Sequence, residues 1–522
     1  MRRTAHSRFG KDEGSPTPTR RQVVQGVAGA GAALLAPRLG LSREAKDSFA
    51  LAEWTGETFA PMHAIRDGLW NKPLPPPERS ADVVVIGGGL AGLTVGALLA
   101  DYDLVLLERE AELGGNARAG TWRGVDYALG SAYLVDISGP YGSLYEKLGL
   151  TPHPVPETVN SVFTGAPRSP DALKGTLRAP FARLRQHLQG IVGSADFPKI
   201  PIEKATARAL ALDGVSFLDY LRRQNVDPVL QELIDAYCYS SFSAGADAVS
   251  AYVGVNFYSE IVSPIYAFPG GNAFLSRALK GQIERSGAGR LQTGAAVFAV
   301  EPAEEGLSRV GWFNVAEPSA PRCIAARWVV VATPYFFAGR ILRGVDPDAT
   351  AIMKGTARGS YLVANCCFDG RLKLSSYDAW TPSNAAFTDV VDASAVLPPK
   401  ARPTTHGVLT LYAPFRDPSQ GRALLLEGNR AALSGPIVDA LRRFLPDAFV
   451  SARLTEMRLT RWGHQHLIPR PGTVTRMRGL RKQFGNVLLA HSDGQGAPAV
   501  ESAVAEGLRV AAAIRSKRRG EL

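Results

Sequence analysis

The chain has 522 residues, 45% of them hydrophobic and 20% charged, a composition typical of a soluble protein with more than one domain. Its net charge of +11 comes without a basic stripe or interleaved aromatic residues, so nucleic-acid binding is not expected. The four cysteines have no spacing that indicates a disulfide framework or a metal site.

The N-terminal segment has the pattern of a targeting signal. A polar, charged lead ends in Arg20-Arg21, and a weakly apolar stretch rich in glycine and alanine follows from Val23 to Ala36. As a helix this stretch would be about 21 Å long, shorter than the ~30 Å hydrocarbon core of a membrane. The segment resembles a twin-arginine export signal, with Val-Val where that family prefers Phe-Leu.

The resemblance implies that residues 1–41 are a signal for the twin-arginine export machinery and that the protein is periplasmic or extracellular. A basic tail without regular structure is the alternative. Residues 42–78, which end in KPLPPPE, are expected to form a linker or an arm lying on the surface. The rest of the chain has no stretch of about 18 unbroken apolar residues, so no transmembrane span is expected.

The stretch from Asp82 to Ala100, DVVVIGGGLAGLTVGALLA, predicts a strand, a glycine-rich turn and a helix. The apolar run before the glycines is typical of a parallel strand buried on both faces. Gly87, Gly89 and Gly92 have the spacing of a dinucleotide-binding loop. The first glycine permits a tight turn, the second lets the backbone approach a pyrophosphate, and the third lets the helix pack against the strand.

The helix expected after this loop would complete a phosphate site. It begins near Leu90 and Ala91, where unpaired N–H groups and the helix dipole favour an anion. A second predicted strand, LVLLE, ends at Glu108, about 20 residues past the first glycine, where a carboxylate can accept hydrogen bonds from a ribose diol. The whole pattern predicts a Rossmann-like dinucleotide-binding domain.

The stretch after Glu108, REAELGGNARAG, resembles the second glycine pair of flavin-containing amine oxidases and phytoene-desaturase-like enzymes. In that superfamily the pair lets the chain pass close to the flavin end of FAD. The family usually has Arg directly after the glycines, whereas this chain has Asn there and Arg two residues later. The resemblance implies FAD, bound non-covalently because the C-terminal block has no cysteine. The contacts expected from this stretch are Arg109, Gly114, Gly115, Asn116, Ala117 and Arg118.

Three further blocks resemble the same superfamily. YAFPGGNAFLSRAL, residues 266–279, is similar to its Pro-Gly-Gly loop, and the strand that follows would meet the adenine at Val297. ARWVVVATP, residues 326–334, is similar to the strand and Thr-Pro turn that leave the FAD domain. Near the C-terminus, Asp493 matches an acid that binds the ribityl chain, and a helix starting near Ala499 and Val500 would face the isoalloxazine.

These patterns predict an α/β fold with a Rossmann-like FAD-binding domain assembled from discontinuous segments. The expected segments of this domain are residues 79–150, 266–344 and 479–522. A second, α+β substrate domain is expected from residues 151–265, which have helical periodicity, and residues 345–478, whose short apolar runs are typical of strands.

The resemblance implies an FAD-dependent oxidoreductase that moves a hydride from an amine or an unsaturated lipid-like small molecule to flavin N5. Amine oxidases of the family often have a Lys near N5 that assists reaction with oxygen. The matching position here falls near Ser360 or Tyr361. A dehydrogenase or desaturase with an unidentified electron acceptor is therefore favoured over an oxidase.

The catalytic candidates come from the stretch RWGHQHLIP and from YALGSAY. Trp462 would form an apolar wall over the flavin, and His464 or His466 would act as a base or orient a polar group. Tyr133 is a similar candidate, and a structural role is the alternative for each of these side chains.

Two other functions are compatible with the same fold. A flavin-dependent isomerase or saturase would use FAD without net oxidation of its substrate. A binding protein of the GDP-dissociation-inhibitor type shares the fold and performs no flavin chemistry, although the flavin-side pieces Gly114-Gly115 and Asp493-Gly494 argue against it.

Overall fold

The computed structural model describes residues 48–68, 70–155, 159–164, 166–168, 177–287, 289–372, 374, 377–381, 385–464 and 466–520. The predicted export signal, residues 1–41, lies outside the described residues. From Phe49 onward the described residues form one compact unit.

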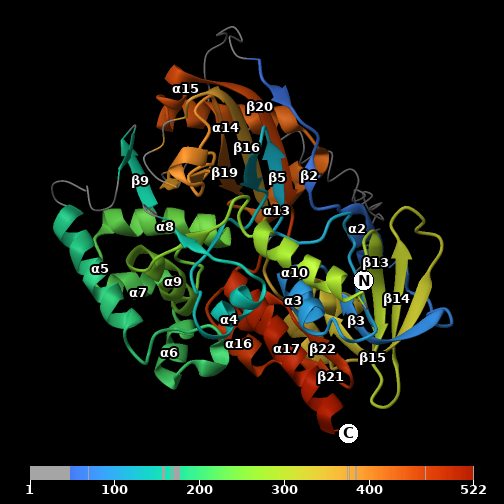
Figure 1. The fold of residues 1–522 in the computed structure, drawn as a ribbon. Coiled ribbons are helices and arrows are strands. Elements are labelled where there is room, and N and C mark those ends of the chain that lie inside the picture. Colours follow the sequence, from blue (N-terminus) through green and yellow to red (C-terminus); the bar gives the residue numbers. More distant parts are fainter. Residues whose placement is uncertain are drawn as a thin grey trace, which may run out of the picture. The chain divides into compact units, whose positions relative to one another are not determined.

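A parallel sheet of Rossmann type occupies the lower right of Figure 1. In spatial order its parallel strands are β12 (Gly289–Gln292), β4 (Leu104–Leu107), β3 (Arg79–Ile86), β15 (Arg322–Val331) and β22 (Val487–Leu489). They come from three stretches that are far apart in the sequence. The predicted fold class, a Rossmann-like domain assembled from discontinuous segments, is therefore confirmed.

An antiparallel extension widens this sheet. The first half of β15 pairs with β14 (Ser308–Asn314), which pairs with β13 (Ala295–Glu301), and the short β21 (Gln483–Phe484) pairs with β22. Helices α11 (Tyr335–Ile341) and α12 (Pro347–Lys354) follow β15 and pack beside the extension.

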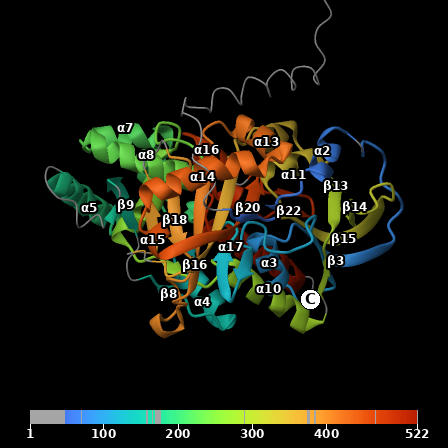
Figure 2. The same ribbon diagram turned by 90° about the horizontal axis from the view of Figure 1, so that it is seen from above.

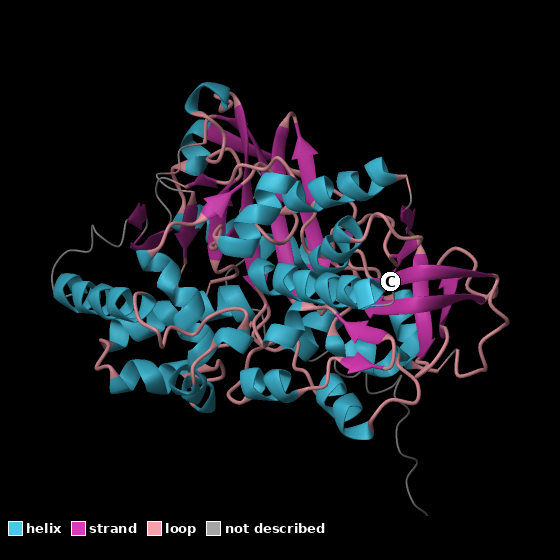
Figure 3. Cartoon of the chain, turned by 60° about the horizontal axis from the view of Figure 1, so that its bottom comes forward, coloured by secondary structure: helices cyan, strands magenta, loops and turns pink. Residues whose placement is uncertain are grey.

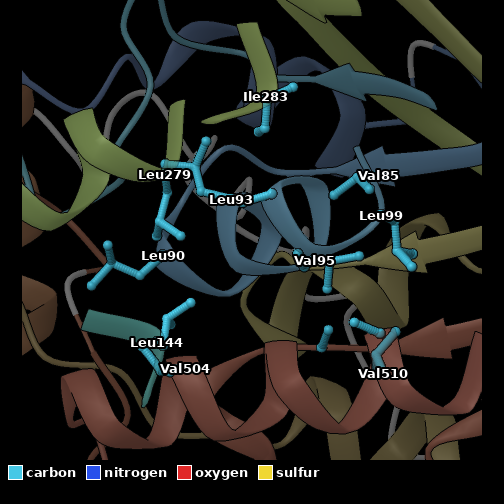
Figure 4. Packing of buried hydrophobic residues seen from close by; sticks show 14 of the residues in the cluster. Val85, Leu90, Leu93, Val95, Leu99, Leu144, Leu279, Ile283, Val504 and Val510 are labelled. Atoms are coloured by element: carbon cyan, nitrogen blue, oxygen red, sulfur yellow. The ribbon is translucent and has the colours of Figure 1, made fainter. Parts of the chain in front are cut away.

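Helix α3 (Leu90–Leu98) lies in the centre of the apolar core on the other face of the sheet. Figure 4 shows it between α10 (Ala273–Ser286), which presents Leu279 and Ile283, and α17 (Val500–Gly520), which presents Val504 and Val510. All four side chains are fully buried. Each contributes roughly 1.5–3 kcal/mol relative to an exposed position, so this contact fixes where the glycine loop before α3 lies.

A second, larger sheet lies at the top of Figure 1. Its order is β1 (Ala50–Leu51), β20 (Ala452–Trp462), β16 (Tyr361–Gly370), β19 (His406–Pro414), β18 (Asp389–Asp392), β17 (Asp378–Trp380), β9 (Val159–Thr164) and β10 (Ala166–Arg168). The helices associated with it are α13 (Pro418–Glu427), α14 (Arg430–Phe444) and α15 (Ala448–Ser451). Figure 2 shows α14 lying across its strands, and Figure 3 shows the two sheets as separate groups of strands.

Helices α5 to α9 form a separate apolar cluster, green in Figure 1. Their bounds are α5 (Arg178–Val192), α6 (Ala207–Ala211), α7 (Phe217–Arg223), α8 (Pro228–Phe242) and α9 (Ala251–Tyr258), with short 3₁₀ turns η3 (Ile202–Lys204), η4 (Leu212–Gly214) and η5 (Ser259–Val262). The remaining elements are β5 (Ala119–Trp122), β6 (Val125–Ala128), β7 (Tyr133–Leu134), α4 (Gly139–Lys147), β8 (His153–Pro154), β11 (Tyr266–Ala267), η6 (Pro399–Ala401), α16 (Thr473–Gly479) and η7 (Ser492–Gln495). The helices and the larger sheet together give the expected α+β part.

The segment expected to be a linker or surface arm carries regular structure. Its first strand, β1, and its second, β2 (Thr55–Gly56), both pair in parallel with β20. Helix α2 (Ala60–Arg66) follows. The larger sheet thus has two strands from the N-terminal arm, which hydropathy patterning does not reveal because each strand is only two residues long.

Several site types are absent from the part of the chain that the structure describes. Its four cysteines are buried and form no disulfide. No group of His, Cys, Asp or Glu side chains among the described residues is arranged to hold a metal ion. None of the described helices is both long and apolar enough to cross a membrane.

Candidate cofactor and substrate site

One cavity of about 980 Å³ connects the Rossmann sheet with the larger sheet. This volume is near the upper end of the ~300–1,000 Å³ usual for small-molecule sites. The cavity meets the Rossmann sheet where β3 and β4 end, the edge at which open α/β sheets bind ligands. The predicted site residues that line it are Gly87, Gly89, Leu90, Ala91, Glu108, Arg109, Gly114, Gly115, Asn116, Ala117, Arg118, Tyr133, Val297, Trp462, His464, Ala499 and Val500.

The glycine loop leaves room for a ligand at its backbone. Gly87 has φ +104° and a Cβ there would lie 2.8 Å from the Ala332 carbonyl oxygen, so the turn requires glycine. A Cβ on Gly89 would meet nothing within 4 Å, which shows that this residue faces open space. A Cβ on Gly92 would lie 2.0 Å from the Gly87 carbonyl oxygen, so Gly92 serves helix packing and does not line the cavity.

Helix α3 begins at this loop without a side-chain cap. Gly89 is its N-cap residue, and no side chain accepts hydrogen bonds from the first turn. Leu90 and Ala91, whose N–H groups belong to that turn, line the cavity. Unsatisfied N–H groups and the helix dipole make such a terminus suited to a phosphate.

Glu108 is fixed at the end of β4 by two backbone groups. The Gly88 N–H donates to Oε2 at 2.6 Å and the Glu110 N–H donates to Oε1 at 2.8 Å. Burial raises the pKa of Glu108. A carboxylate has about four acceptor positions, so it can also accept hydrogen bonds from a ribose diol in the cavity.

The second glycine pair packs directly on the first loop. The Gly114 N–H donates to the Gly88 carbonyl at 2.7 Å, and Gly114 forms an isolated parallel bridge with Gly89. Gly115 has φ +57°, and a Cβ on it would lie 3.1 Å from the Gly89 Cα. The two loops therefore form one glycine-lined corner of the cavity.

Arg118 links this corner to the larger sheet. Its Nε donates to the Gly115 carbonyl at 3.0 Å, and its Nη2 donates to the Gly56 carbonyl of the arm at 3.0 Å. The guanidinium lies 5.0 Å from the ring centroid of Trp462. Arg109, by contrast, pairs with Glu110 at 2.7 Å.

The C-terminal corner of the cavity is formed by the loop that contains Asp493. Asp493 is fully buried and is not among the lining residues, whereas Ser492 and His491 are. The Asp493 carboxylate accepts a hydrogen bond from the Tyr335 N–H at 2.9 Å and pairs with Arg358 at 2.6 Å. Burial opposes its ionisation, but Arg358 and His491 hold the pKa of Asp493 well below its usual range. Direct contact of Asp493 with a cofactor stays a prediction, and Ser492 is its neighbour that lines the cavity.

Aromatic residues line the end of the cavity at the larger sheet, and the polar groups of three of them are already bonded. The indole of Trp462 donates to the Leu129 carbonyl at 2.8 Å, and the hydroxyl of Tyr412 donates to the Gly130 carbonyl at 2.7 Å. The hydroxyl of Tyr361 donates to the Tyr239 carbonyl at 3.0 Å. These three side chains therefore offer a ligand mainly ring surface.

Glu260 and Asp389 are buried carboxyl groups that also line the cavity. Burial raises the pKa of Glu260 to about 8, and the Tyr133 hydroxyl lies 3.4 Å from its Oε1. Burial also raises the pKa of Asp389, although its Oδ1 accepts hydrogen bonds from Ser240 and Thr388, both at 2.7 Å. Neither group belongs to a local sequence motif, so the sequence alone does not single them out.

The predicted histidines have different surroundings. His464 stacks on Phe336 with 4.8 Å between ring centroids, and its Nδ1 lies 3.6 Å from Glu57 of the arm. His466 also lines the cavity, and burial lowers its pKa to about 3, so it is neutral at ordinary pH. Its Nε2 has no hydrogen-bond partner within the described part of the chain.

The residues present fit a dinucleotide such as FAD. Besides the glycine corner and the uncapped helix, Thr333 lines the cavity, and its buried hydroxyl has no partner among the described residues. An orphaned buried hydroxyl at a cavity wall is what a polar ligand would satisfy. Val297, on β13, lines the cavity as the resemblance implies for the adenine.

Comparison with known proteins matches one family model, described as an NAD(P)-binding Rossmann-like domain, over residues 85–148. This stretch holds both glycine loops, the helix between them and Glu108. No curated protein matches the chain.

Solved structures match over most of the chain. Wild-type putrescine oxidase bound to putrescine has a TM-score of 0.65 at 18% identity, covering 84% of this chain and 100% of its own. Cyclohexylamine oxidase from Brevibacterium oxydans has a TM-score of 0.62 at 19% identity, covering 84% and 100%. An oxidoreductase from Methanosarcina mazei has a TM-score of 0.60 at 15% identity, covering 82% and 99%. At these identities the likeness concerns the fold: the chain shares the α/β fold of these three proteins.

Proposed function

We propose that this chain is an FAD-dependent oxidoreductase that takes a hydride from a small molecule. The observation that carries the proposal is the continuity of one cavity. It joins two glycine loops suited to a dinucleotide with a pocket of aromatic rings and carboxyl groups suited to a substrate. The shared fold with putrescine oxidase and cyclohexylamine oxidase supports the same conclusion.

The chain's own residues would hold FAD at several points. The N–H groups of Leu90 and Ala91 would bind phosphate, Glu108 would bind ribose hydroxyls, and Ser492 and Thr333 would offer hydroxyl groups farther along the cavity. When bound, the flavin supplies the hydride acceptor, so the protein need only orient a C–H bond and exclude water.

The substrate end favours an amine over an unsaturated lipid-like molecule. Glu260 and Asp389 are carboxyl groups that a cation would pair with, and ionisation of both would become favourable once it did. The ring faces of Tyr361, Tyr412 and Trp462 attract cations as well. Both features support a substrate that enters as an ammonium ion.

We favour an electron acceptor other than oxygen. Tyr361 lines the cavity near the position at which the resembling oxidases often have a Lys, and the Ser360 hydroxyl donates to the Pro418 carbonyl. Among the described lining residues the lysines are Lys199 and Lys204, and both are exposed to solvent.

An isomerase or saturase is the second candidate, and Glu260 supports it. A carboxyl group whose pKa is about 8 keeps its proton at neutral pH, so it could protonate an unsaturated substrate in the cavity.

The test begins with the purified protein, which is expected to be yellow with the visible absorption bands of bound flavin. Without oxygen, amines should bleach this colour, and an artificial acceptor should restore it faster than air does. Bleaching by polyenes, or their isomerisation without bleaching, would replace the amine proposal with the lipid or isomerase one. A colourless protein that does not take up FAD would overturn the enzyme proposal in favour of a non-catalytic binding protein.

We also propose that the protein leaves the cytoplasm through the twin-arginine machinery and works in the periplasm or outside the cell. Arg20-Arg21 and the glycine- and alanine-rich stretch after them support this. Replacing both arginines by lysine should leave the protein in the cytoplasmic fraction with its FAD bound. Unchanged export of that variant would contradict the proposal.

A further inference from the structure

The N-terminal arm runs along the cavity. Glu57, Met62 and Ile65 all line it. Met62 and Ile65 pack against the apolar cluster that contains Val297 of β13, whereas Glu57 contacts the turn that follows Trp462. The arm therefore reaches from the Rossmann sheet to the larger sheet along one side of the cavity.

The arm is bonded to the loop that carries the expected cofactor contacts. The Gly56 carbonyl accepts a hydrogen bond from Arg118. The Thr58 N–H and hydroxyl donate to the carboxylate of Glu110 at 2.9 and 2.7 Å.

The arm is also packed against β20. Arg461 lies between two aromatic rings of the arm, 5.4 Å from the centroid of Trp54 and 4.9 Å from that of Phe59. Gly56 has φ +102°, and a Cβ there would lie 2.3 Å from the Arg461 carbonyl oxygen. Only glycine permits this approach, so the contact of arm and strand is specific.

Glu57 joins these two sets of contacts. Its Oε2 accepts hydrogen bonds from the N–H groups of Gly463 at 2.9 Å and His464 at 3.1 Å. Its Oε1 lies 3.9 Å from Arg109. Burial opposes ionisation, but the hydrogen bonds from His464 and the charge of Arg109 lower the pKa of Glu57 to about 2, so it stays charged. One carboxylate thus holds the turn after Trp462 and faces the cofactor loop.

We propose that residues 54–65 are the outer wall of the dinucleotide site and that Glu57 is its positioning residue. The inference rests on the proposed binding of FAD. For a dinucleotide to leave, we expect the arm to part from β20, the strand on which it packs. Parting of the arm therefore sets the rate of cofactor dissociation.

A reversible crosslink tests this directly. The hydroxyl oxygens of Thr55 on β2 and Thr460 on β20 are 2.7 Å apart, so cysteines at both positions bring two sulfurs within bonding reach. Oxidised Thr55→Cys/Thr460→Cys protein should release FAD at least about tenfold more slowly than the same protein after reduction with a phosphine. Release is followed by the fluorescence of free flavin after dilution. The two single-cysteine variants are the controls and should not respond to the reductant.

Substitutions of Glu57 in the full chain test the converse expectation, that a weakened arm releases FAD faster. Glu57→Gln keeps an oxygen for the two N–H groups but loses the charge, whereas Glu57→Ala loses both. FAD dissociation should accelerate by about tenfold in Glu57→Ala and by less in Glu57→Gln. The matched control is Glu53→Ala, because Glu53 is an arm carboxylate that is 90% exposed and pairs with Arg430.

The outcomes separate this inference from the proposed function. A wild-type protein that does not bind FAD overturns the proposed function. A wild-type protein that binds FAD, with equal dissociation rates for the crosslinked and reduced forms and for Glu57→Ala, overturns the inference about the arm alone. A purely structural role for Glu57 would lower the unfolding free energy of the FAD-free protein while leaving the dissociation rate of the folded protein unchanged.

Discussion

At the scale of single residues, Glu260 makes the sharpest prediction about pH. Burial raises its pKa to about 8, and Tyr133, Tyr237, Asp389 and Glu501 face it. Because the folded protein holds this proton more tightly than the unfolded chain, stability falls as pH rises from about 4.5 to about 8 and then levels off. The total is up to about 5 kcal/mol. Denaturant unfolding of the FAD-free wild type and of Glu260→Gln at pH 5 and 8.5 measures this loss. Between these pH values the free energy of unfolding should fall further in the wild type than in the variant.

The exposed Glu53 provides the control, since Glu53→Gln should follow the wild-type pH dependence. If the curves of wild type and Glu260→Gln run parallel, Glu260 does not hold a proton in the folded state. Addition of an amine that binds at this site should shrink the difference, because a bound cation favours the ionised carboxylate.

Some residues of the site could be predicted from the sequence and others could not. Gly87, Gly89 and Glu108 belong to one strand–turn–helix–strand unit, so their positions follow from local spacing. Glu260 and Asp389 meet only because a helical cluster and the larger sheet come together, and no local pattern records that. Contact of Asp493 with the ribityl chain stays a prediction, because its carboxylate is fully buried and pairs with Arg358, which lies far away in the sequence.

At the scale of elements, the packing of α17 on α3 depends on a glycine. A Cβ on Gly507 would lie 2.7 Å from the Cβ of Thr94 and 2.9 Å from the Ala91 carbonyl oxygen. Gly507→Ala should therefore destabilise the fold by roughly 1–3 kcal/mol, although alanine is the better helix former. Gly190→Ala in α5 is the matched control, because a Cβ there meets nothing within 4 Å, and should stabilise by roughly 0.5–1 kcal/mol. Equal shifts in thermal unfolding would contradict the close packing.

Elements were predicted well where they are long and periodic, and poorly where they are short. Strand β3 and helices α3 and α17 lie where the apolar runs place them. Strands β1 and β2 have two residues each and gain their order from β20, far away in the sequence. Because these strands depend on pairing with β20, the local sequence of the arm predicts a linker, although the folded arm lines the cavity.

At the scale of the whole molecule, one buried ion pair connects the turn after β22 of the Rossmann sheet to the segment before β16 of the larger sheet. Arg358 precedes β16 and is 4% exposed, and Asp493 in η7 is fully buried. Removing one partner leaves an uncompensated buried charge, so Arg358→Met should destabilise the protein by roughly 3–5 kcal/mol. The double variant Arg358→Met/Asp493→Asn should recover part of this loss, because the second change removes the stranded charge. A double-mutant cycle of unfolding free energies measures the coupling, and strictly additive effects would show that the two parts are held together by other contacts.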